Sequence, residues 1–207
     1  MDAIPAFKEI ELKRVIVATK NPGKIREIEE ILEDDRYRIV SMKEAGIAAD
    51  IVEDGTTFEE NALIKARAVA KLCNEPVLAD DSGLEVDYLG KEPGIYSARY
   101  LGEDTSYTIK NAAIIKRLEG VPDPERTARF VCAVACVLPG GEEIVVRDTM
   151  EGRIGYEERG ENGFGYDPIF RPDGYSVSSG ELPMDEKNEI SHRGKALRQM
   201  ADLLVEK

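Results

Sequence analysis

The chain contains few cysteine and histidine residues, which form the disulfides of small secreted folds and bind zinc. Its 207 residues include one histidine, His192, and three cysteines, Cys73, Cys132 and Cys136. The last two cysteines lie four apart in an apolar stretch, with no C-x-x-C spacing and no histidine near them. We therefore expect buried free thiols rather than disulfides or zinc ligands. The lone histidine has no cysteine beside it and is more typical of a structural residue than of a metal ligand.

Long apolar runs and positive charge are also scarce. No apolar stretch reaches the length that crosses a membrane, and the N-terminus lacks the apolar core of a signal peptide. We therefore expect a cytoplasmic protein without a membrane partner. The 28 Lys and Arg residues face 41 Asp and Glu residues, a net charge of -13. This balance disfavours nucleic acid as a partner. A polyanionic substrate would have to be met by local cationic pockets and a divalent metal.

The length suits a single domain over residues 1–207, or one domain with a lobe, with an ample core. Apolar periodicity predicts strands at residues 15–18, 77–79, 84–86, 128–138 and 144–150. Helices are expected over 22–32, from Thr57 (with Glu60 as a capping box) to about 73, from Asp104 or Thr105 to about 118, and after Ser191. Residues 152–180 are expected to be ordered loops. The elements mix without strict alternation, which indicates a mixed sheet in an α/β or α+β architecture.

The fragment at residues 77–83, Val-Leu-Ala-Asp-Asp-Ser-Gly, places two adjacent carboxylates after a short apolar run. Such a run is typical of a buried strand, in which neighbouring residues point to opposite faces. Asp80 and Asp81 can point the same way only if the chain turns there, and Gly83 would make a turn easy. Together with Glu53, these acids have the oxygen ligands that Mg²⁺ prefers. The alternative is that the acids and Ser82 only stabilise a turn.

The segment at residues 19–24, Thr-Lys-Asn-Pro-Gly-Lys, joins a strand to a helix. Free N–H groups at a helix start bind phosphate readily. Lys20 and Lys24 add positive charge, and Thr19 and Asn21 can donate hydrogen bonds. The segment is not a Walker A loop. Taken alone, it is more typical of a capped helix with solvated lysines.

Three further patterns are weak when each is taken alone. Asn61 and Lys65 lie one helical turn apart and could point into a cleft, although a solvated helix face is the commoner reading. In the segment at residues 163–168, Phe164 or Tyr166 could stack on a base or could anchor the core. His192, next to an arginine at a helix start, could recognise carbonyl oxygens or phosphates.

These patterns occur in one order along the chain, and in that order they resemble the inosine/xanthosine triphosphate pyrophosphatase family, whose members hydrolyse non-canonical purine nucleoside triphosphates. The matching stretches are VIVATKNPGKIREIEEIL, TFEENALIKARAVA, VLADDSGLEVDYLG, PGIYSARY, GFGYDPIF and ISHRGKAL, from about residue 15 to residue 197. The resemblance implies an elongated mixed β-sheet flanked by helices, two lobes with a cleft between them, and a homodimer. It also implies Mg²⁺-dependent release of pyrophosphate and nucleoside monophosphate from ITP, dITP and XTP.

The resemblance also implies roles for single residues. Glu53 and Asp81 would bind the metal, and Asp81 would accept the proton, with Asp80 as its rival. The implied substrate-binding residues are Thr19, Lys20, Asn21, Pro22, Gly23, Lys24 and Lys65 for phosphates, Ser82, then Phe164, Gly165, Tyr166 and Asp167 for the base, and finally Lys187, His192 and Arg193.

Two other functional classes stay open from the sequence. One is a pyrophosphatase that acts on modified pyrimidine nucleotides. The other is a nucleotide-binding protein without catalysis, although a pure binder has no need of the paired acids.

Overall fold

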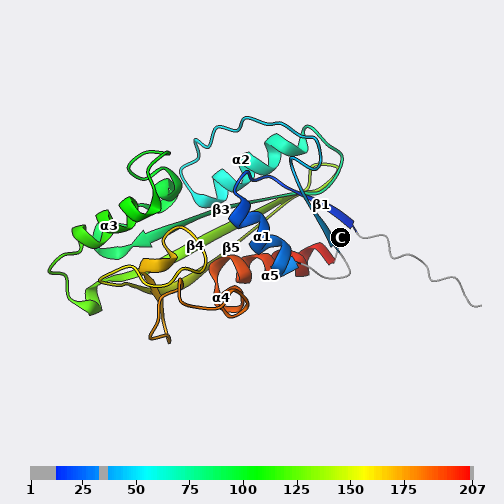
Figure 1. Cartoon of the computed structure of the whole chain (residues 1–207). Helices are drawn as coiled ribbons and strands as arrows, with labels where there is room; N and C mark the ends of the chain where they lie inside the picture. Colours follow the sequence, from blue (N-terminus) through cyan, green and yellow to red (C-terminus); the bar gives the residue numbers. More distant parts are fainter. Residues whose placement is uncertain (1–12, 33–36, 206–207) are drawn as a thin grey trace, which may run out of the picture.

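The computed structural model describes residues 13–32 and 37–205 and contains a six-stranded mixed sheet with the strand order β2-β1-β3-β4-β5-β6 (Figure 1). The strands are β1 (Lys13–Val17), β2 (Tyr37–Ser41), β3 (Val77–Val86), β4 (Thr127–Val137), β5 (Glu143–Ile154) and β6 (Phe170–Pro172). Strand β1 pairs in parallel with β2 and β3, whereas the pairs from β3 to β6 are antiparallel. The predicted mixed sheet is thereby confirmed.

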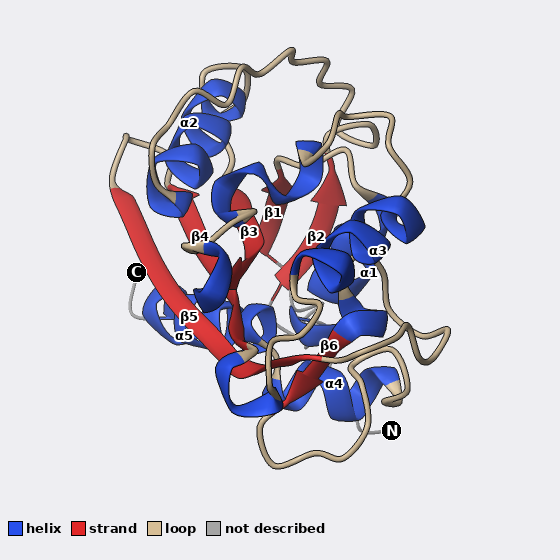
Figure 2. Cartoon of the chain, turned by 90° about the vertical axis from the view of Figure 1, so that its left-hand side faces the viewer, coloured by secondary structure: helices blue, strands red, loops and turns tan. Residues whose placement is uncertain are grey.

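Helices cover both faces of this sheet. They are α1 (Pro22–Leu32), α2 (Phe58–Ala70), α3 (Tyr107–Arg117), α4 (Met184–Ile190) and α5 (His192–Val205). Figures 1 and 2 show α2 on one side of the long strands and α5 on the other. No helix within the described ranges is both long and apolar enough to span a bilayer. The prediction that a signal peptide is lacking concerns the N-terminus, and residues 1–12 lie outside the described part of the chain.

The two faces of the sheet hold separate apolar clusters, and β3 contributes to both. Leu78 packs with α1 and α5, whereas Val77 and Ala79 pack with α2. A third cluster, which includes Leu84 and Val86, packs under α3 at the far end of the sheet. This alternation is the period of two that a strand imposes on its side chains. Asp80 therefore continues the α1/α5 face, and Asp81 continues the α2 face.

The prediction of a turn at the paired acids is wrong. Strand β3 runs without interruption from Val77 to Val86, and Asp81 stands opposite Ala133 of β4 in regular antiparallel register. Gly83 has a different role from the one predicted. A Cβ atom added there would collide with the carbonyl oxygen of Gly94 and lie 2.6 Å from Ser97 Oγ. Glycine is therefore needed because another segment packs against the strand here.

Several predicted boundaries also shift. Helix α2 ends at Ala70, and α3 begins after Ser106, whose hydroxyl caps Ile109 N–H, rather than after residue 104 or 105. The Thr57 hydroxyl accepts from Glu60 N–H, as a capping box requires. The Glu60 carboxylate accepts from the N–H of Thr56, the residue before the cap. Part of the stretch 152–180 belongs to the sheet, through the end of β5 and through β6.

Other predictions about the local structure are confirmed. The Ser191 hydroxyl caps the start of α5 by accepting from Gly194 N–H at 2.9 Å. All three cysteines are free; Cys132 and Cys136 are buried in β4, and Cys73 is half-buried.

We predict that Gly83→Ala lowers the free energy of unfolding by about 1–3 kcal/mol, because the added methyl group has to displace the backbone at Gly94. Gly155→Ala is the matched control, since its added Cβ would lie 3.5 Å from the nearest atom, at ordinary contact distance. Urea unfolding of both variants checks this expectation. Equal stability of the two variants would show that the close approach at Gly83 is not constraining.

Candidate active site

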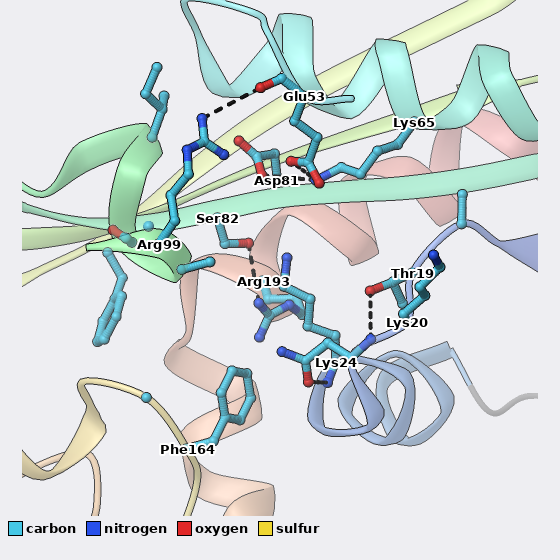
Figure 3. A pocket seen from close by; sticks show the side chains of 18 of the residues that line it. Thr19, Lys20, Lys24, Glu53, Lys65, Asp81, Ser82, Arg99, Phe164 and Arg193 are labelled. Carbon is cyan, nitrogen blue, oxygen red and sulfur yellow. Dashed lines mark hydrogen bonds and ion pairs between the residues drawn. The ribbon is translucent and has the colours of Figure 1, made fainter. Parts of the chain in front are cut away.

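A cavity of about 430 Å³ lies at the carboxyl end of β1, beside the middle of β3 (Figure 3). Its walls come from the β1–α1 loop, α2, β3, the turn at Gly94–Arg99, the 163–167 loop and the start of α5. The volume is in the usual range for small-molecule sites. Of the metal-binding and substrate-binding residues that the resemblance implies, all but Pro22 and Gly23 line this cavity, whereas the further candidates Asp80 and Asn61 do not.

The α2 side of the cavity holds one shared cation between two acids. Lys65 Nζ lies 2.9 Å from Asp81 Oδ1 and 2.9 Å from Glu53 Oε2. Asn61 Nδ2 donates to the other oxygen of Asp81 at 3.3 Å. Asn61 and Lys65 are 0 % and 7 % exposed, so the solvated helix face that was the commoner reading is wrong. Burial raises the pKa of Asp81, and the lysine only partly opposes this.

The opposite face of β3 holds Asp80. Lys24 Nζ lies 3.0 Å from Asp80 Oδ2, and Arg193 Nε and Nη2 both donate to the same oxygen at 3.3 Å. The Ser82 hydroxyl also donates to this oxygen, at 2.7 Å. Burial raises the pKa of Asp80, but the charges of Lys24 and Arg193 outweigh burial and hold the pKa far below its usual range. Asp80 is thus held as an anion at neutral pH through Oδ2, whereas its buried Oδ1 has no hydrogen-bond partner among the described residues, and the side chain does not line the cavity.

A run of alternating buried charges links Asp80 to the 163–167 loop. Arg193 also pairs with Glu27 of α1, and Glu27 in turn binds Lys187 Nζ at 2.8 Å. Lys187 then reaches Asp167 Oδ2 at 2.8 Å. We call these five residues, Asp80, Arg193, Glu27, Lys187 and Asp167, the buried charge chain. Because Asp167 accepts from Phe164 N–H at 2.8 Å, the chain also sets the position of the aromatic loop.

The aromatic end of the cavity is formed by Phe164. Its ring centroid lies 5.3 Å from Lys187 Nζ and 5.6 Å from Arg193 Cζ, and the ring itself is only half-buried. Tyr166 is different, since its ring is buried edge-on against Tyr107 and its hydroxyl donates to Ser97 O at 2.8 Å. Of the two aromatics proposed for stacking on a flat ligand, Phe164 is therefore the available one, and Tyr166 anchors the core.

His192 lies at the same end as a neutral ring. It stacks on Phe130 with an interplanar angle of 11°. Burial, together with the neighbouring positive charges of Arg193 and Lys187, lowers its pKa well below the ordinary value. Within the described residues its buried Nδ1 has no hydrogen-bond partner. A neutral imidazole has one donor and one acceptor nitrogen, so a polar ligand group could pair with it.

The loop at residues 19–24 differs from the prediction in one respect. The N–H groups of Gly23 and Lys24 are capped by the Asn21 side chain, whose Oδ1 accepts from them at 2.9 and 3.3 Å. The free helix start expected for phosphate is therefore already occupied. Lys20 remains exposed on this wall (Figure 3), and Lys24 forms an ion pair with Asp80.

The donor set at Glu53 and Asp81 fits Mg²⁺. The two carboxylates already share one positively charged group, Lys65, at hydrogen-bond distance. In the described part of the chain no three His, Cys, Asp or Glu side chains converge as a closed metal site. Mg²⁺ is commonly held by one or two carboxylates, with water and substrate phosphates completing its shell.

Sequence reasoning missed several residues around this site, and two of them, Glu27 and Arg99, are important for its charge. Glu27 is one of several acids on α1, and nothing in the local pattern distinguishes it from its exposed neighbours Glu29 and Glu30. Arg99 lines the cavity from the turn at Gly94–Arg99. It belongs to the stretch PGIYSARY, which contributed to the family resemblance although none of its residues was given a role.

Comparisons with known proteins agree with the resemblance. The model of the Ham1 family matches residues 15–203. A dITP/XTP pyrophosphatase of Bacillus subtilis is 49% identical over 94% of this chain and 98% of its own length. One of Caldanaerobacter subterraneus is 47% identical over 94% and 97%, respectively.

Solved structures give the same result. The structure of the Staphylococcus aureus Ham1 protein has a TM-score of 0.83 and 41% identity, covering 94% of this chain and 100% of that one. A HAM1 protein from Coxiella burnetii has a TM-score of 0.85 and 38% identity, covering 95% and 100%.

We predict that Asp80→Asn lowers the free energy of unfolding by about 3–5 kcal/mol at pH 7, because it leaves Lys24 and Arg193 buried without this counter-charge. The folded-state pKa of Asp80 lies below its unfolded value of about 3.9, so the carboxylate stabilises the fold above that pH and loses this contribution as the pH falls. The stability gap between wild type and variant should therefore narrow in acid.

Chemical denaturation at several pH values measures this gap. Asp173→Asn, at an exposed position, is the control and should stay within about 0.5 kcal/mol of wild type. A gap that stays constant down to pH 3 would contradict the role given to Asp80.

Proposed function

This chain belongs to the Ham1 family, and we propose that it hydrolyses the non-canonical purine nucleoside triphosphates ITP, dITP and XTP to the monophosphate and pyrophosphate. Such an activity clears these nucleotides from the pool that supplies DNA and RNA synthesis. The observation that carries the proposal is the cavity itself. It combines an acid–lysine cluster at one end with an open aromatic ring at the other, as a ligand with a charged chain and a flat base requires.

The proposed reaction is the attack of water on the α-phosphorus. The bond between this phosphorus and the bridging oxygen to the β-phosphate breaks, and pyrophosphate leaves. Asp81 is proposed to orient the water and accept its proton, because it faces the cavity and burial raises its pKa. Asp80 is a poor candidate, since its pKa is held low and its charge is taken by Lys24 and Arg193.

Glu53 and Asp81 would hold Mg²⁺. When bound, the ion would supply positive charge that offsets the charge developing on the leaving pyrophosphate. Lys65 lies between these two acids and would keep their negative charges balanced as the ligand enters. Lys20 would add a cation from the opposite loop, so that phosphate is met from more than one side.

Base selection is proposed to depend on the 6-position of the purine. Hypoxanthine and xanthine carry a carbonyl acceptor there, whereas adenine carries an amino donor. His192, Arg193 or a backbone N–H at the start of α5 would donate to this carbonyl while Phe164 stacks on the ring. Adenine would leave that donor buried and unpaired, which carries a large penalty. Guanine shares the carbonyl, so its rejection has to rest on its 2-amino group.

We also propose, on the family resemblance alone, that the protein forms a homodimer and acts in the cytoplasm.

We expect pyrophosphate release from ITP, dITP and XTP to exceed that from ATP and GTP by at least about tenfold, as loss of a buried hydrogen-bond partner would produce. The panel should be run with Mg²⁺ and with EDTA, and EDTA should abolish release. Modified pyrimidine triphosphates are included as competitors. A preference for these pyrimidines, or binding of ITP with Mg²⁺ but without pyrophosphate release, would each replace the proposal with one of the two rival classes.

Asp81→Asn should lower the rate of ITP hydrolysis by about 10²–10⁴-fold, since it removes the proposed proton acceptor and one metal ligand while keeping the side-chain shape. Pyrophosphate release under saturating Mg²⁺ measures this, with Asp173→Asn as the control of equal charge change. An unchanged rate in Asp81→Asn would refute the central assignment.

A further inference from the structure

The turn at Gly94–Arg99 forms one wall of the cavity and ends in an arginine. Arg99 Nη2 donates to the backbone oxygen of Glu53 at 3.5 Å, and its guanidinium carbon lies 4.9 Å from the Tyr96 ring centroid. Figure 3 shows this guanidinium at the end of the cavity that holds Glu53 and Asp81, away from Phe164. Arg99 thus lies at the polar end of the site and has no role in the function proposed above.

The charges that line the cavity are unevenly neutralised. Four of its cationic side chains have carboxylate partners: Lys24 with Asp80, Lys65 with Glu53 and Asp81, Lys187 with Glu27 and Asp167, and Arg193 with Glu27 and Asp80. Among the described residues, Lys20 and Arg99 line the cavity without an ion pair to a carboxylate. They lie on either side of Asp81 and Ser82 in Figure 3. Lys20 and Arg99 can therefore contact a polyanion without giving up an ion pair, although the exposed acids Asp50 and Glu103 also line the cavity.

The turn that carries Arg99 is fixed by Ser97. The Ser97 hydroxyl donates to Gly94 O at 2.6 Å and accepts from Leu84 N–H of β3 at 2.9 Å. Its carbonyl oxygen accepts from the Tyr166 hydroxyl at 2.8 Å. Gly83 lets this turn approach the strand closely, as the added-Cβ distances show. The turn is thereby tied both to the strand that carries Asp81 and to the aromatic loop.

Helix α3 adds a further tie. Lys110, whose side chain is almost fully buried, donates from Nζ to Ala98 O at 2.6 Å and lies over the Tyr107 ring. Burial lowers the pKa of this lysine. Burying the Lys110 ammonium, with a backbone carbonyl as its hydrogen-bond acceptor, costs free energy. This cost is consistent with a need to fix the position of the adjacent residue, Arg99.

We propose that Arg99 is a further substrate-binding residue, whose guanidinium contacts the phosphate chain of the nucleotide from the wall opposite residues 19–24. The planar fork of arginine matches phosphate oxygens with two parallel hydrogen bonds. The stacking on Tyr96 and the bond to Glu53 O hold the side chain ready before the ligand arrives. This inference rests on the proposed function, because it takes the ligand to be a triphosphate.

The test replaces Arg99 with glutamine and uses inorganic tripolyphosphate, a phosphate chain without a base, as the probe. Arg99→Gln should weaken tripolyphosphate binding, measured by titration calorimetry at fixed Mg²⁺, by about 10- to 100-fold, the range for a lost charged hydrogen bond. The KM for ITP and for XTP should rise by one common factor. Arg99→Lys, which keeps the charge but not the fork, should recover part of the loss.

Arg117→Gln is the matched control. Arg117 binds Glu92 and Tyr100 on the outer side of the same stretch, so this variant removes the same charge away from the cavity. It should bind tripolyphosphate as the wild type does. Unchanged tripolyphosphate binding in Arg99→Gln, or a changed ratio of ITP to XTP turnover, would overturn the proposal. If Arg99→Gln has a lowered thermal stability, the binding test uses Arg99→Lys instead. Tripolyphosphate binding equal to that of the wild type in Arg99→Lys would then contradict the proposal.

The binding measurement separates this inference from the proposed function. A wild-type protein that releases no pyrophosphate from any triphosphate, yet binds tripolyphosphate through Arg99, would refute the function and leave the Arg99 contact standing. If the wild type releases pyrophosphate from the triphosphates but Arg99→Gln binds tripolyphosphate as tightly as the wild type does, the Arg99 contact is refuted and the proposed function stands.

Discussion

The architecture of the site depends on one constraint: charges buried between the sheet and its helices have to be neutralised within the protein. An unpaired buried ion costs several kcal/mol. The buried charge chain meets this constraint by alternating acids and bases from β3 through α5, α1 and α4 to the 163–167 loop. Each inner member has a partner on both sides, so segments far apart in the sequence are held in register. The cavity walls are therefore in place before any ligand binds, which is the condition for electrostatic preorganisation.

Much of the fold could be predicted from apolar periodicity. The strand at 128–138, apolar on both faces, is the central strand β4, and the final helix begins at the predicted serine cap. These elements are determined by burial patterns within one segment, which a single sequence displays. The candidate site residues came mainly from the order of several weak motifs, because no local pattern was decisive. The structure places nearly all of them around one cavity.

The errors arose where the reason for a residue lies in a distant segment. Gly83 after a short apolar run is typical of a turn, yet it is required by the approach of Gly94 to a continuous strand. Asn61 and Lys65 have the spacing of a solvated face, but Asp81 and Glu53 provide their partners. Glu27 is buried because two cations from the C-terminal helices meet it. None of these pairings leaves a local signal, since each joins residues that only the tertiary fold brings together.

Because of strand β3, the site is sensitive to insertions and deletions in this strand as well as to substitutions. Its register against β4, with Leu78 opposite Cys136 and Asp80 opposite Val134, decides which acid faces which side. Because side chains alternate, a one-residue slip would exchange the two faces. Asp80 would then enter the cavity, and its neighbour would face Arg193. The spacing between the start of this strand and its paired acids is therefore a constraint of its own: a substitution changes one side chain, whereas a single insertion or deletion would move every side chain downstream of it to the other face.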